Sequence, residues 1–170
     1  MNIKKTANLF INFTIKRLAE IFGLIIVFSG LSLLVALLSY SPEDPNFIFP
    51  NNSEIKNILG FKGSYISDLF FQTIGLTAYL VSLTLIVTGF NIFRHKEFFL
   101  IIENLFFSVI FSIFSSLFFA YFYTNAFSLY INGNGGFVGN YLNQTFLINI
   151  IQINEKFFYY FLIIVISVLF

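Results

Sequence analysis

The chain has 170 residues, of which 58% are hydrophobic and 10% are charged, and its 9 Lys and Arg nearly balance its 8 Asp and Glu. A soluble domain carries about a quarter charged residues, so this composition excludes an ordinary water-soluble domain and leaves no basic surface for nucleic acid. Because the chain has no cysteine, disulfides and thiolate metal sites are excluded as well.

The N-terminal part of the chain predicts a lead-in helix followed by a first membrane span. Residues 1–20 carry four cations among apolar residues at helical spacing, which is typical of an amphipathic helix that lies at the interface and continues into the membrane. The first span covers about residues 21–40, which hold no charge, since a spanning helix needs roughly 20 apolar residues. Pro42 and Pro45 end it, because proline lacks an N–H and disfavours helix at the preceding residue.

A second and a third span are predicted on either side of a short charged turn. The second covers about residues 69–93, and Asp68 is expected to cap its first turn, because a carboxylate accepts hydrogen bonds from the N–H groups there. The turn itself is Arg94-His95-Lys96-Glu97. The third span covers about residues 99–123, in which Glu103 is the one charged residue.

Small side chains predict the faces on which these helices pack. On the third span they recur at every fourth position, at Ser108, Ser112, Ser116 and Ala120. Such a line lets two helices approach closely, so that dispersion contacts and hydroxyl hydrogen bonds form between them. Shorter patches on the other two spans are Gly23 and Gly30, Ala78 and Ser82, and Thr84 and Thr88. We expect helix packing on these faces, and self-association through the line on the third span.

The last part of the chain predicts a second long polar loop and a further helix. In the loop, residues 124–156, apolar side chains recur at three- and four-residue spacing from Phe137 to Phe146, which predicts an additional amphipathic helix on the membrane surface. The final segment, 157–170, is too short to cross the membrane, so we expect a fourth span that is cut. The predicted fold class is therefore all-α: one polytopic membrane domain over 1–170 with a bundle of four transmembrane helices.

The distribution of cations predicts the orientation in the membrane. The lead-in and the 94–97 turn hold six Lys and Arg, whereas the two long loops, 41–68 and 124–156, hold three. Because cytoplasmic segments carry the excess of Lys and Arg, we expect the N-terminus and the turn in the cytoplasm and both long loops outside.

The sequence predicts no catalytic, cofactor-binding or metal-binding residue. A charge at the bilayer centre costs about 3 kcal/mol, and Glu103 lies only about one turn into its span, which favours an interfacial position over an ion relay. His95 stands between two cations and has no second ligand near it, which favours a solvated turn residue over a metal ligand. Glu43 and Asp44 are adjacent and lack the alternate spacing of a calcium loop, so turn formation explains them better. The glycines within 133–139 lack the Lys and the Ser or Thr of a phosphate loop.

Two blocks of the sequence resemble one known family. The first is similar to the end of the first transmembrane segment and the following turn of FtsK/SpoIIIE-type DNA translocases, and reads Ala36-Leu37-Leu38-Ser39-Tyr40-Ser41-Pro42-Glu43-Asp44-Pro45-Asn46-Phe47. The second resembles the family's approach to its second span, and includes Asn57-Ile58-Leu59-Gly60, Ser67-Asp68-Leu69-Phe70 and Gly75-Leu76-Thr77-Ala78-Tyr79. Gly135, Gly136 and Gly139 are similar to a glycine block before its last span. The stretch that leads into the first transmembrane segment is also similar, and reads Arg17-Leu18-Ala19-Glu20-Ile21-Phe22-Gly23-Leu24, so the resemblance covers about residues 16–142.

The resemblance implies a function that the residues alone do not. In this family a membrane domain anchors the protein at the division septum and contacts other division proteins, and a linker, a hexameric ATPase motor and a DNA-reading domain follow. It therefore implies a bacterial inner-membrane anchor and assembly domain that acts in cell division and chromosome segregation, with ATP and DNA handled only by domains beyond residues 1–170. The alternative, a small transporter or channel subunit, needs broken helices or buried charges near the midplane.

Overall fold

The computed structural model describes residues 3–45, 54–124, 132–147 and 154–170, and these ranges contain helices and no strand, in agreement with the predicted all-α class. The helices are α1 (Ile3–Leu38), α2 (Gly60–Ile74), α3 (Thr77–His95), α4 (Phe99–Phe122), α5 (Gly136–Leu142) and α6 (Glu155–Leu169), and a π-helical turn at Asn143–Leu147 follows α5. Among the described residues, three segments are long and apolar enough to cross a membrane, namely Asn8–Leu38 of α1, the whole of α3 and the whole of α4. The chain is thus a polytopic membrane domain.

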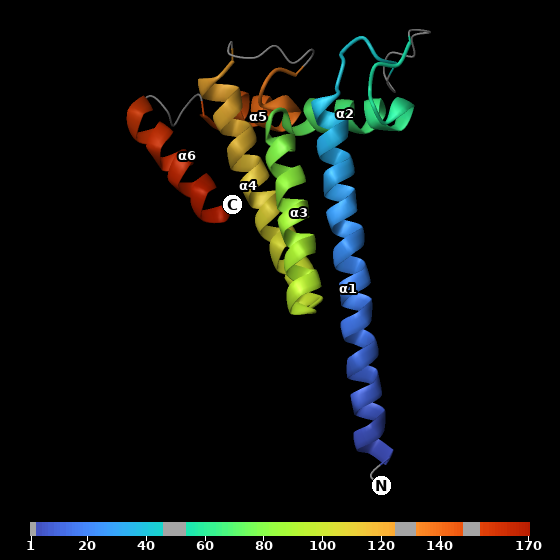
Figure 1. Cartoon of the computed structure of the whole chain (residues 1–170). Coiled ribbons are helices and arrows are strands. Elements are labelled where there is room, and N and C mark those ends of the chain that lie inside the picture. The colour runs from blue at the N-terminus through green and yellow to red at the C-terminus, as the bar shows by residue number, and fades with distance from the viewer. Residues whose placement is uncertain (1–2, 46–53, 125–131, 148–153) are drawn as a thin grey trace.

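The predicted lead-in and first span form one uninterrupted helix, α1, of 36 residues. At 1.5 Å per residue α1 is about 54 Å long, well above the roughly 30 Å of a hydrocarbon core. In Figure 1 it extends far beyond the ends of α3 and α4. Its C-terminal end, Leu38, lies shortly before the two prolines, as expected.

The prediction of a single second span over residues 69–93 is wrong. This apolar run is divided between α2 and α3, and the break falls at Gly75, whose φ of +61° and ψ of −140° leave the helical region. Figure 1 shows α2 running across the end of α1 rather than beside it, so α3 alone provides the crossing. Asp68 therefore does not cap a span: it lies inside α2 and accepts a hydrogen bond of 3.1 Å from the Tyr40 hydroxyl.

α3 and α4 form an antiparallel hairpin that agrees closely with the predicted turn and third span. Lys96 ends α3 in the left-handed conformation, with φ of +62°, and its N–H donates to the Ile92 carbonyl at 2.7 Å. This turn and the N-terminal part of α1 point to one end of the molecule, which we call the turn end, whereas α2 and α5 lie at the opposite end, the loop end (Figure 1).

The remaining helices pack against α4. α5 covers part of the predicted surface helix, and it lies beside α2 and α4 at the loop end (Figure 1). α6 corresponds to the predicted fourth span, but its 15 residues are too few to cross a membrane. The Asn154 side chain caps α6 by accepting a hydrogen bond from the Phe157 N–H at 3.3 Å.

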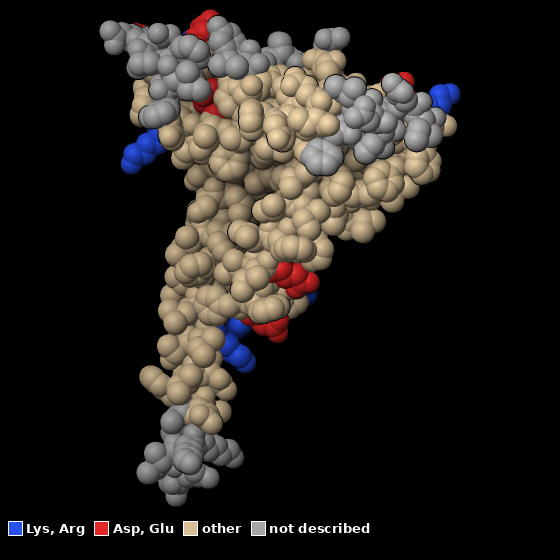
Figure 2. All heavy atoms as spheres, turned by 180° about the vertical axis from the view of Figure 1, so that it is seen from behind, with Lys and Arg blue, Asp and Glu red and all other residues tan. Residues whose placement is uncertain are grey.

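A small apolar core lies where α1, α2 and α3 meet. It contains the buried side chains of Leu33, Leu37, Phe71 and Ala78. Most other large apolar side chains face outward, as in Phe28, which is 66% exposed. In Figure 2 the charged side chains gather in a tier at the loop end and another toward the turn end, with a broad uncharged band between them. Such a band is what spanning helices present to lipid.

Candidate functional site

The first candidate functional feature is a glycine seam between α1 and α3. A Cβ atom built on Gly23 would lie 2.7 Å from the Gly89 carbonyl oxygen and 2.7 Å from the Phe93 nitrogen. One built on Gly30 would lie 3.0 Å from the Ser82 carbonyl oxygen and 2.8 Å from the Ile86 side chain. The two backbones are therefore in contact, which is possible only with glycine at these positions. This confirms the predicted packing role of Gly23, Gly30 and Ser82.

An ion cluster closes the same helix pair at the turn end. Glu20 of α1 accepts from Arg17 at 2.6 Å and from Lys96, on the α3–α4 turn, at 2.7 Å. The Glu20 side chain is only 16% exposed, whereas that of Arg17 is 57% exposed and lies over the Phe13 ring. Charge-assisted hydrogen bonds at a half-buried carboxylate are stronger than surface ion pairs, so Glu20 fixes α1 to the turn.

A second glycine junction holds α2, α3 and α5 together at the loop end. The N–H of Leu76 donates to the Asn134 carbonyl at 2.9 Å, and the Asn134 side chain donates to the Tyr123 carbonyl. A Cβ on Gly136 would lie 2.5 Å from the Gly75 nitrogen, and one on Gly75 would collide with the Asn134 carbonyl. Both glycines have positive φ, of +61° and +63°, so they meet a steric and a conformational requirement together.

The small-residue line on α4 packs within the chain at its loop-end half. Ser116 is fully buried and its hydroxyl donates to the Ile74 carbonyl at 3.1 Å, and Ala120 is 2% exposed. Cβ atoms built on Gly135 or Gly139 would collide with the Ser116 carbonyl. This half of the line therefore holds α5 and the α2–α3 break against α4.

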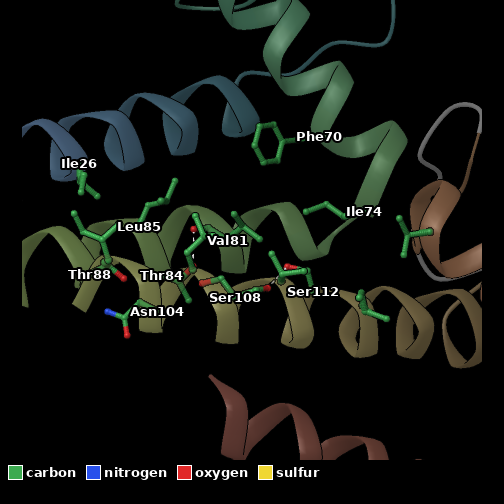
Figure 3. A pocket seen from close by; sticks show the side chains of 15 residues that line it. Ile26, Phe70, Ile74, Val81, Thr84, Leu85, Thr88, Asn104, Ser108 and Ser112 are labelled. Carbon is green, nitrogen blue, oxygen red and sulfur yellow. Dashed lines mark hydrogen bonds between the residues drawn. The ribbon is translucent and has the colours of Figure 1, made fainter. Parts of the chain in front are cut away.

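The other half of the line faces a pocket of about 560 Å³ between α3 and α4, into which α1 and α2 also project side chains (Figure 3). Ser108 and Ser112 line this pocket opposite Thr84. The Ser112 hydroxyl donates to the Ser108 carbonyl at 2.5 Å and the Thr84 hydroxyl to the Val81 carbonyl at 2.8 Å. Because these hydroxyls are already bonded to their own helices, the wall that they form behaves as an apolar surface.

The loop that follows α1 is held by a buried carboxylate. The two oxygens of Asp44 accept from the backbone N–H groups of Lys56 and Asn57, each at 2.9 Å, and the Asn57 side chain donates to the Ala36 carbonyl at 2.9 Å. At the surface, the Lys56 ammonium binds the Glu43 carboxylate, and this contact lowers the pKa of Glu43 and raises the pKa of Lys56. The turn role expected for these two acids agrees with these contacts.

The other singled-out residues occupy the following places. Glu103 is exposed on α4, and Lys96 of the preceding turn binds Glu20 rather than Glu103. His95 is exposed at the end of α3. Gly135, Gly136 and Gly139 form a helix junction, and no group of three or more His, Asp or Glu that could hold a metal occurs among the described residues.

Sequence reasoning missed several residues that hold the helices together. Asn57 and Asn134, both buried, supply side-chain bonds to helix-end carbonyls, and Gly75 breaks the second apolar run. The available signal was a glycine inside an apolar segment, which indicates a close backbone approach. A second signal was available for Glu20: it follows Arg17 by three residues, and opposite charges at this spacing on a helix indicate an ion pair.

Comparison with known proteins identifies the family. The profile described as the 4TM region of DNA translocase FtsK/SpoIIIE matches residues 15–170. A DNA translocase FtsK of Bradyrhizobium diazoefficiens is 36% identical over 84 residues, which are 49% of this chain and 10% of that protein. The FtsK of Rickettsia typhi is 34% identical over 67 residues, 39% of this chain and 9% of that protein.

The chain spans about a tenth of the length of these curated relatives. No solved structure matches it. With more than half of its length matched by the family profile, the chain belongs to the FtsK/SpoIIIE family, of which it is the 4TM membrane region, a multi-pass segment of the inner membrane.

Proposed function

We propose that this chain is the membrane anchor and septal assembly domain of a DNA translocase that acts in cell division and chromosome segregation. The observation that carries the proposal is the match of the family's 4TM region to residues 15–170. This segment requires no cofactor, and ATP hydrolysis and DNA binding belong to other domains of the protein. Its role is to hold the protein in the bilayer and to contact other division proteins.

The packing of the helices supports an anchor better than a transporter or channel subunit. The glycine seam and the loop-end junction join helix backbones directly, which suits a rigid anchor. A transporter needs charged or unwound sites near the midplane, whereas Figure 2 shows the charges in two tiers with an uncharged band between them.

Exchange of the membrane domain tests the proposal. The domain alone, fused to a fluorescent protein, is expected at the division septum. The full-length protein in which an unrelated four-span segment replaces residues 1–170 is expected to stay in the membrane but to leave the septum. The proposal is refuted if the isolated domain spreads evenly around the cell while the exchanged protein still reaches the septum.

The orientation that we propose places the N-terminus and the α3–α4 turn in the cytoplasm. The excess of Lys and Arg at the turn end supports it. Reporter fusions at positions 50, 95 and 135 are expected to report outside, inside and outside. A fusion at 95 that reports outside contradicts this orientation.

We also propose self-association, now through Ser108 and Ser112, which are partly exposed where they line the open pocket between α3 and α4, because Ser116 and Ala120 are buried within the chain. The sequence has no native cysteine, so S108C can be oxidised in membranes without background. We expect a disulfide-linked dimer from this variant and none from the control V168C, whose position is 79% exposed on α6. Equal dimer yields from both variants argue against a specific contact.

A further inference from the structure

α2 buries mainly small and polar residues and exposes most of its large apolar ones. The buried residues are Gly63, Ser64, Ser67, Asp68 and Phe71. The large apolar residues on the other side are Phe61, Tyr65, Ile66 and Leu69, which are 36% to 53% exposed. A helix on the surface of a soluble protein has the opposite arrangement, with its apolar side toward the core. The exposed side of α2 therefore requires a surrounding other than water.

The length and direction of α2 exclude a crossing. Its 15 residues measure about 22 Å, less than the roughly 30 Å of a hydrocarbon core. Figure 1 shows it running across the loop-end terminus of α1. Comparison with Figure 2 places α2 at the edge of the uncharged band, beside the loop-end tier of charges. This is the level of the boundary between headgroups and acyl chains.

α5 is joined to α2 in the same layer. The Asn132 side chain donates to both the backbone and the side-chain oxygen of Gln72, each at 3.1 Å. On α5, Phe137 and Tyr141 are 60% and 56% exposed, and their rings stack with centroids 6.0 Å apart. We call α2 and α5 together the in-plane layer.

Polar groups on the exposed side of α2 suit a boundary with lipid. The Thr73 hydroxyl donates to the Leu69 carbonyl at 2.9 Å, so it needs no water. Lys62 is the one charged residue on this side, and a lysine stem can lie along apolar surface while its ammonium reaches phosphates. A tyrosine such as Tyr65 is likewise suited to a place between lipid and water.

We propose that the in-plane layer lies flat at the headgroup–acyl boundary of the leaflet at the loop end, with its exposed apolar side chains against phospholipid. Lipid is the occupant that the structure favours, because Phe28 of α1, Ile66 of α2 and Leu85 of α3 line one open groove, so the exposed side of α2 continues into the apolar outer surface of these spans. The inference rests on the proposed anchor function. It adds a second attachment, parallel to the membrane, that sets the depth and tilt of the spans.

Single tryptophans can measure the depth of this layer, because the native sequence has none. L69W on α2, F137W on α5 and V109W, near the middle of α4, are reconstituted separately into phosphatidylcholine vesicles. The lipids carry bromine either near the headgroup or near the acyl terminus. We expect the headgroup-proximal bromine to quench L69W and F137W at least twofold more than the deep bromine, and the deep bromine to quench V109W more.

The outcomes separate this inference from the proposed function. Strong quenching of V109W with unquenched, water-like emission from L69W overturns the inference and leaves the anchor intact. Blue-shifted emission from L69W that neither lipid quenches also overturns it, because protein then covers the layer. Failure of V109W to be quenched refutes membrane insertion itself. If L69W does not fold, F61W, which exchanges one aromatic ring for another on the same side of α2, gives the same measurement.

Discussion

Substitution of Gly23 tests whether the glycine seam holds α1 against α3. A Cβ at this position lies 2.7 Å from the Gly89 carbonyl oxygen, and ordinary contact begins near 3.4 Å, so G23A must separate the helices by about 0.7 Å (3.4 minus 2.7). Overpacking of this kind costs about 1–3 kcal/mol of stability, and the higher helix propensity of alanine offsets about 1 kcal/mol of that cost. We therefore expect G23A to lower the free energy of unfolding by about 0–2 kcal/mol, and the larger side chain of G23L to lower it by at least about 2 kcal/mol.

The assay is unfolding by sodium dodecyl sulfate in mild detergent micelles, followed by the near-ultraviolet circular dichroism of the 9 tyrosines. S29L is the matched control, because it introduces the same side chain on the same helix at an exposed position. We expect S29L to unfold within about 0.5 kcal/mol of the native chain, the range usual for surface substitutions.

A double variant sharpens the test. Gly23 and Gly89 touch each other, so once G23A has separated the helices, G89A should cost less than it does alone. Additive losses would mean that the two glycines act independently. If G23L unfolds like S29L, the backbone contact between α1 and α3 does not stabilise the domain and the reasoning fails.

Three further outcomes are expected in the same unfolding assay. E20Q should destabilise the domain measurably, because it removes a carboxylate that binds two cations, whereas E103Q, at an exposed position, should have no measurable effect. D44N should lower the free energy of unfolding by about 1–3 kcal/mol, since an amide has one acceptor oxygen for the two backbone N–H groups that Asp44 binds. An unchanged unfolding midpoint would show that the contacts of Asp44 do not stabilise the domain. The hydrogen bond from Lys56 lowers the pKa of Glu43 in the folded state. The stability that this pair contributes is therefore fully present above the unfolded pKa near 4.5, and it is lost as pH falls through the lower pKa of the folded state. That loss should be small, because both groups are exposed, and E43Q should abolish it; a pH dependence that survives in E43Q has another origin.

The packing contacts could be predicted where they depend on local patterns. The small residues at Gly23, Gly30, Ser82 and Ser116 all lie in tight helix contacts, because only small side chains allow backbones to approach. Their partners could not be predicted, since a four-residue line fits another copy of the chain as well as another helix of the same chain. The structure assigns the loop-end half of the line on α4 to α5 and to the α2–α3 break.

The sequence by itself determined that this protein lies in a lipid bilayer, and it determined the extent of α1 and α4, because hydropathy and segment length decide locally whether a helix can cross lipid. It did not determine that the apolar run over 69–93 breaks at Gly75. That break depends on the Asn134 carbonyl and on Gly136, which lie about sixty residues later in the chain and occupy the space that a continuous helix would need. Only the tertiary structure brings these groups together, and it thereby turns α2 across the end of the bundle and places Asp68 against Tyr40 instead of at a helix start.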